Sequence, residues 1–155
     1  ILLSYSFIIK KRCSKERENI KILHEGYKML YTINTKSSID SIKEDMASRA
    51  KEQGFGVLKE YHFKEILSSK GCPIEKDITV FEVCNPGAAQ TILDTYPEVS
   101  VFLPCRISLY EIDGETILST IGIDNIIDNF ALDNEIKNYM NTIFEKVKKI
   151  MNTWQ

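Results

Sequence analysis

The chain has 155 residues, of which 43% are hydrophobic and 27% charged, and its net charge is −2 at pH 7. This length and balance predict one globular domain with an extension, whose core needs no disulfide or metal to stay folded. The charge argues against nucleic-acid binding, because a protein that neutralises phosphates needs an excess of lysine and arginine.

The N-terminal region, residues 1–26, is expected to lie outside the main domain. Residues 1–9 are apolar and are followed at once by Lys10-Lys11-Arg12. They are too few to cross a bilayer, which takes about 20 helical residues. We interpret them either as an apolar arm or as the end of a longer membrane segment that tethers the protein. With a tether, the basic flank predicts the cytoplasmic face of the membrane; otherwise we expect a cytoplasmic protein. Residues 10–26 predict a charged linker helix.

The main domain is predicted over residues 27–155 and begins with a strand. Alternating apolar residues over 27–35 are typical of a strand with one buried face. Helical spacing then predicts a helix that starts near Ser37 and stops at Gly54, a residue suited to a left-handed cap. A second strand over 55–61 and a short helix over 62–70 follow.

The second half of the domain is predicted to add strands and helices that alternate less regularly. These elements are expected over residues 78–84, 88–96, 99–111 and 116–121. Pro104 cannot donate a ladder hydrogen bond, so it indicates a bulge or an edge within the third of these segments. Asp113-Gly114 is a turn signal between the last two strands.

The most regular helical pattern lies at the C-terminus. Apolar residues recur at helical spacing from Ile136 to Met151, after a cap at Asp124 or Asp133. Such a stripe must pack on the sheet. The sequence therefore predicts a two-layer α+β fold, with an antiparallel or mixed sheet, helices on one face and a long C-terminal helix.

Cys84 carries the most specific chemical signal in the chain. It ends a predicted strand and precedes Asn85-Pro86, which are a preferred N-cap and a preferred first helical residue. The positive end of a helix favours a thiolate, which would suit a nucleophile, a redox sensor or a soft-metal ligand. The alternative is a buried cysteine that acts as a small hydrophobe.

Cys105 is the second candidate. Alternation along its strand groups it with four apolar residues on a face that resembles core: Val101, Leu103, Ile107 and Leu109. If this strand pairs near residues 78–84, Cys84 and Cys105 approach each other. The four cysteines, which also include Cys13 and Cys72, contain no CxxC pattern, so the common zinc and dithiol signatures are missing. We assign no metal site.

Three polar residues complete the candidate set. Arg106 and Tyr110 share the opposite face of the same strand with Ser108, where they could hold an anion or simply face solvent or a second subunit. His62, at the start of a short predicted helix, is a candidate metal ligand or proton carrier, or else a surface histidine.

Four motifs resemble one known family. In chain order they are Gly54-Phe55-Gly56-Val57-Leu58, Cys84-Asn85-Pro86 with Ala88-Ala89, Leu103-Pro104-Cys105, and Leu109-Tyr110-Glu111 before the Asp113-Gly114 turn. They resemble the family called domain of unknown function 302, over about residues 27–130. The resemblance implies a two-layer α+β domain similar to the TATA-box-binding-protein fold, often paired as a dimer. It implies no activity, because the family has no established one.

Three functions therefore stay open. The first is a non-enzymatic homodimer that binds an unidentified small ligand or soft metal near Cys84, Asn85 and Cys105. The second is a thiol-redox or thiol-nucleophile protein that uses Cys84, with Cys105 as its resolving partner. The third is a structural or assembly module with inert, buried cysteines. No cofactor is identified.

Overall fold

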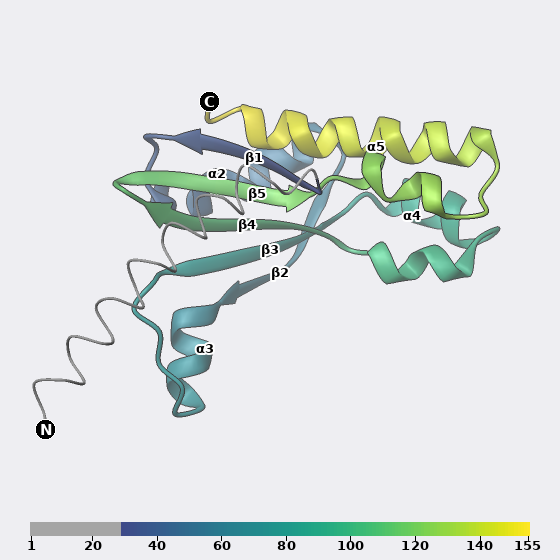
Figure 1. Ribbon diagram of the computed structural model, residues 1–155. Helices are drawn as coiled ribbons and strands as arrows, with labels where there is room; N and C mark the ends of the chain where they lie inside the picture. Colours follow the sequence, from purple (N-terminus) through teal and green to yellow (C-terminus); the bar gives the residue numbers. More distant parts are fainter. Residues whose placement is uncertain (1–28) are drawn as a thin grey trace, which may run out of the picture.

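The computed structural model describes residues 29–155 (Figure 1). The apolar N-terminal segment, the linker helix over residues 10–26, Cys13 and the membrane tether lie outside the described residues. Those predictions stay untested.

Among the described residues, five strands form a single antiparallel sheet in the order β1-β5-β4-β3-β2. The strands are β1 (Leu30–Thr35), β2 (Gly56–His62), β3 (Ile78–Cys84), β4 (Cys105–Ile112) and β5 (Glu115–Ile121). The predicted hairpin between β4 and β5 is confirmed: its turn residues Asp113 and Gly114 have positive φ angles of 53° and 82°. Two such residues in succession suit the twist of a tight hairpin.

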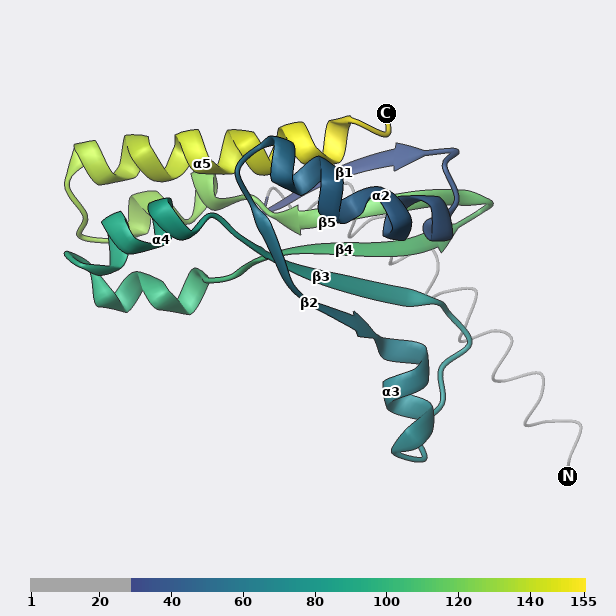
Figure 2. The ribbon, with the colours of Figure 1, turned by 180° about the vertical axis from the view of Figure 1, so that it is seen from behind.

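The helices are α2 (Ile39–Glu52), α3 (Phe63–Ser69), α4 (Pro86–Leu93) and α5 (Asn134–Asn152), with 3-10 turns η1 (Pro97–Phe102), η2 (Ile123–Asn125) and η3 (Ile127–Asn129). Figures 1 and 2 show α2 and α5 on the same side of the sheet, and residues of both helices share one core cluster with the strands. The predicted two-layer α+β fold with a long C-terminal helix is confirmed.

Alternation along each strand separates the two faces of the sheet. On β3, Thr79, Phe81 and Val83 are buried against the helices, while Glu82 and Cys84 belong to the alternate set. We call the second side the open face, because neither α2 nor α5 covers it. The covered face holds the main core, formed by residues including Ile42, Met46, Phe81, Ile107, Leu109, Leu118, Phe144, Val147 and Ile150.

The cap of α5 follows one of the two predicted alternatives. Asp133 is the N-cap, and its Oδ1 accepts a hydrogen bond from the Ile136 backbone N–H at 2.8 Å. The predicted apolar stripe is buried at Met140, Phe144, Val147, Ile150 and Met151. The N-terminal part of α5 packs with α4 and the 3-10 turns in a second cluster, which contains Ile92, Val99, Ile127, Leu132 and Met140.

Two boundaries were predicted wrongly. The cap of α2 is Ser38, whose side chain accepts from the Ser41 N–H, and not Ser37. The strand expected over 99–111 begins only at Cys105, because Pro97 opens η1 and Pro104 offers no N–H to the ladder. As a result Val101 does not belong to the core face, and its side chain is 74% exposed.

Candidate functional site

Three of the four sequence motifs meet at one end of the sheet. The register pairs Gly56 of β2 with Cys84 of β3, and Val83 of β3 with Cys105 of β4. We call this region the glycine–cysteine end and define it by Gly54, Gly56, Cys84, Asn85 and Cys105. Residues about 50 positions apart in the sequence thus become neighbours on three adjacent strands.

Gly54 and Asn85 are fitted to each other at this end. Asn85 caps α4, and its Oδ1 accepts a hydrogen bond from the Ala88 N–H at 3.0 Å. Gly54 has a φ of +80°, and a Cβ added to it would lie 3.2 Å from Asn85 Nδ2. Both the backbone conformation and the lack of space therefore require glycine at position 54. The predicted roles of Asn85 as N-cap and Pro86 as first helical residue are confirmed.

Gly56 has a different role, because it leaves space. A Cβ at this position would meet nothing within 4 Å. Since Gly56 is the β2 partner of Cys84, the surface next to the Cys84 thiol is not filled by a neighbouring side chain on that strand.

The two cysteines lie at the same end of the sheet but on opposite faces. Cys105 is paired with Val83 and packs against the main core. Cys84 follows Val83 and therefore belongs to the open face, with Glu82. Both thiols are free and partly buried. The strands of the two cysteines are paired, as the predicted approach required, so Cys84 and Cys105 are close along the sheet. Their side chains, however, lie on opposite faces of the sheet.

Burial governs the ionisation of both thiols. It raises the pKa of Cys84 above its ordinary value of 9.0. It raises the pKa of Cys105 to about 11, with a smaller contribution from negative charge on Cys84. Burial therefore acts against the expected stabilisation of a Cys84 thiolate by α4, a helix of only eight residues.

Arg106 lies on the open face as predicted, but it is paired. Its Nε and Nη2 donate to Glu82 Oε1 at 3.2 and 3.1 Å, and Tyr61 Oη donates to Glu82 Oε2 at 3.2 Å. The Glu82 side chain is 13% exposed and that of Arg106 is 64% exposed. Glu82 and Tyr61 were not among the predicted site residues, although strand alternation places Glu82 on the same face as Cys84.

Tyr110 lies further along the open face, in a cluster of hydroxyl groups. The Tyr110 and Thr32 oxygens each lie 3.1 Å from Ser119 Oγ, and Ser119 is buried. These residues come from β4, β1 and β5, so no sequence spacing indicates their contact. Arg106, Ser108 and Tyr110 do share one face, as expected.

His62 does not join the other candidates. It ends β2 and pairs with Thr79, at the end of the sheet opposite to Gly56 and Cys84. Its Nε2 lies 3.4 Å from Glu60 Oε1, and its Nδ1 lies 3.5 Å from Thr79 Oγ1. The metal-ligand interpretation has no support here, because residues 29–155 contain no group of three or more His, Cys, Asp or Glu side chains placed to hold a metal ion. Within the same residues, no helix has the length and apolarity needed to span a membrane.

Comparisons with known proteins agree with this architecture. A crystal structure described as an uncharacterized conserved protein DUF302 from Bacillus stearothermophilus is similar, with a TM-score of 0.76 and 24% identity, over 83% of this chain and all of the other. An uncharacterized protein of Aquifex aeolicus is 41% identical over 54 residues, which are 34% of this chain and 38% of that protein. The chain thus matches little more than a third of that relative's length.

The sequence also matches the family described as Domain of unknown function DUF302 over residues 31–154. This match covers most of the chain, which therefore belongs to the DUF302 family.

Proposed function

We propose that this domain is a non-enzymatic module that binds a small organic ligand on the open face beside Cys84 and acts as a homodimer. The observation that carries the proposal is the juxtaposition of Gly56, Cys84 and the Glu82–Arg106 pair. Gly56 leaves space next to the thiol, and the charged pair supplies hydrogen-bonding groups one step along the same face. We call these four residues the Cys84 site.

The groups of the Cys84 site favour a neutral ligand that both donates and accepts hydrogen bonds. Arg106 can donate and Glu82 can accept, but their mutual ion pair already neutralises both charges. A simple anion would have to compete with Glu82 for the guanidinium. The apolar part of such a ligand would lie over Gly56 and the protonated thiol of Cys84.

The soft-metal version of the first hypothesis has less support than the organic ligand. Cys84 and Cys105 face opposite sides of the sheet, and thiolate ligation must also overcome their raised pKa values. The same raised pKa of Cys84 counts against a thiol nucleophile, since the thiolate is the reactive form.

A second subunit is supported by apolar side chains on the open face. Leu30 and Ile121 are paired across β1 and β5, and they are 45% and 50% exposed. A second subunit that covers this pair would remove its apolar surface from water. The open face would then contain both the dimer contact and the ligand.

The test is a native mass spectrum of the purified protein, recorded with and without reductant. We expect a dimer that carries an additional small mass, and the same dimer without that mass for Cys84→Ala and Arg106→Gln. Cys72→Ala is the matched control, because Cys72 is exposed and lies outside the Cys84 site. A wild-type spectrum without any additional mass, or one retained equally in all variants, would leave the assembly module as the better account. Loss of the mass on oxidation, with a two-hydrogen mass decrease, would favour the thiol-redox alternative.

A further inference from the structure

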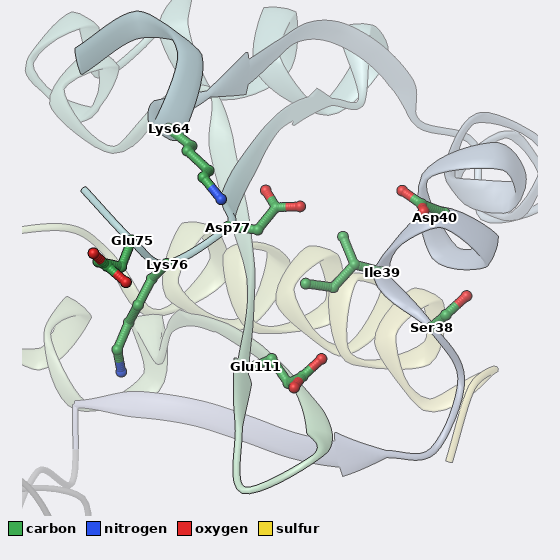
Figure 3. A pocket seen from close by; sticks show the side chains of 8 residues that line it. All are labelled: Ser38, Ile39, Asp40, Lys64, Glu75, Lys76, Asp77 and Glu111. Carbon is green, nitrogen blue, oxygen red and sulfur yellow. The ribbon is translucent and has the colours of Figure 1, made fainter. Parts of the chain in front are cut away.

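A concave site lies at the opposite end of β3 from Cys84. A pocket of about 470 Å³ opens where the start of α2, the start of α3, the loop before β3 and the end of β4 meet (Figure 3). Its lining residues are Ser38, Ile39, Asp40, Lys64, Glu75, Lys76, Asp77 and Glu111. This volume lies within the range of small-molecule sites in proteins.

Two of the four carboxylates in the lining, Asp40 and Asp77, share a single lysine. Lys43 Nζ lies 3.6 Å from Asp40 Oδ1 and 3.7 Å from Asp77 Oδ2, and its side chain is only 19% exposed. Lys43 thereby joins α2 to the start of β3 and fixes one wall of the pocket. Lys43 offsets one of these two negative charges, so the wall keeps a single net negative charge.

The other four charged residues of the lining are two lysines and two glutamates. Within residues 29–155, the side chains of Lys64, Lys76, Glu75 and Glu111 form no salt bridge with one another or with other groups. Figure 3 shows Lys64 and Glu111 on opposite sides of the pocket, with Asp77 and Ile39 at the levels between them. Ile39 is a buried core residue that also lines the pocket, so it supplies an apolar surface between the charged groups.

We propose that this pocket binds a small zwitterion whose ammonium and carboxylate groups are separated by a short aliphatic chain. Lys64 or Lys76 would take the carboxylate, Glu75 or Glu111 the ammonium, and Ile39 the aliphatic chain. A pocket of this volume is roughly 10 Å across if it is taken as a sphere, which suits a chain of about six carbon atoms. The proposal is independent of the Cys84 site, because the whole length of β3 separates Asp77 from Cys84.

The test uses three probes of equal chain length that differ only in charge: 6-aminohexanoate, 1,6-diaminohexane and hexanedioate. Each is titrated into the protein while the backbone amide resonances are followed by two-dimensional NMR. We expect saturable shifts of the Ile39, Lys64 and Glu111 amides with 6-aminohexanoate, with a Kd on the order of 1 mM because the ion pairs are exposed. The diamine and the dicarboxylate should bind at least about 5-fold more weakly, because each would place one of its charged ends against a pocket side chain of the same sign.

Variants identify the side chains that hold the probe. Lys64→Gln and Glu111→Gln should each weaken 6-aminohexanoate binding by about 3-fold or more, while the amide spectra stay those of a folded protein. Glu65→Gln and Lys70→Gln are the controls, because both lie on or next to α3 but outside the lining. Equal binding of all three probes, tighter binding of the diamine, or no saturable shift with 6-aminohexanoate would each overturn the proposal. The Cys84→Ala variant should bind 6-aminohexanoate as the wild type does, so failure here is distinguishable from failure of the proposed function.

Discussion

The two ends of strands β2 and β3 are built differently. At the glycine–cysteine end, Gly54 abuts Asn85, and Cys105 is packed against the core. At the other end, β2 leads into the α3 arm (residues 63–77), which projects from the sheet in Figures 1 and 2. Helix α3 contributes no buried residue, and Gly71 in the arm has open space around it despite its φ of +75°.

In this fold, most of the residues that make a motif recognisable are not the residues that are available for chemistry. Gly54, Asn85 and Pro86 are explained by backbone conformation, close contact and helix capping, without any ligand. The remaining candidates for chemistry are the partly exposed Cys84 thiol with its open neighbour Gly56, and the charged pocket beside the α3 arm.

Truncation of an aromatic residue should destabilise the protein much more in the sheet than in the α3 arm. Phe81 of β3 is 2% exposed, whereas Phe63 of α3 is 36% exposed and stacks on Tyr61. Phe81→Ala should lower the free energy of unfolding by about 3–5 kcal/mol, and Phe63→Ala by about 1 kcal/mol or less. Urea unfolding followed by circular dichroism measures both. Equal losses would show that the arm is packed as firmly as the sheet.

The raised pKa of Cys105 predicts a loss of stability at high pH. Well below pH 9.0 the thiol is protonated in the folded and the unfolded chain, so its contribution is constant. Between pH 9.0 and about 11 the unfolded chain loses the proton first, and the free energy of unfolding falls by about 2–3 kcal/mol.

Cys105→Ala should remove that part of the pH dependence, whereas Cys72→Ala, at an exposed position in the arm, should retain it. Urea unfolding at a series of pH values between 8 and 11.5 compares the two variants with the wild type. An unchanged slope in Cys105→Ala would mean that this thiol is better solvated than its packing indicates.

Alanine at two of the left-handed glycines, Gly54 and Gly71, should distinguish backbone strain from a close contact. Gly71→Ala meets only the backbone strain, which costs about 1 kcal/mol. Gly54→Ala must also displace Asn85 Nδ2, 3.2 Å away, so we expect a loss of about 2–3 kcal/mol in the free energy of unfolding. Chemical denaturation of the two variants side by side decides the question. A smaller loss at Gly54 than at Gly71 would contradict the fitted contact.

Substitution of the residues that precede α4 and α3 should give the smallest difference in stability between the two ends. Asn85→Ala removes the hydrogen bond to the Ala88 N–H and should lower the free energy of unfolding by about 1 kcal/mol. His62 precedes α3 without any side-chain cap hydrogen bond, so His62→Ala should change it by about 0.5 kcal/mol or less. Thermal unfolding compares them, and the order of the two effects is the informative result.

Local patterns were enough to predict most of the secondary structure. Alternation indicated the strands of the sheet, and the apolar stripe from Ile136 to Met151 indicated α5. Asn85-Pro86 and Asp113-Gly114 indicated a helix start and a turn, because these signals act within a few residues of backbone. The error at residues 99–104 has the same local origin, since apolar residues between two prolines were interpreted as a strand.

Composition and motifs were enough to identify Cys84 and Cys105 as candidate reactive groups, because residue type and near neighbours are local properties. Only the tertiary structure decided their arrangement: the register of three strands placed the thiols on opposite faces, paired Arg106 with Glu82 and gathered four segments around the charged pocket. The physical reason is that side-chain contacts across a sheet depend on the alignment of strands far apart in the chain. A shift of one residue in that alignment moves every side chain of a strand to the other face.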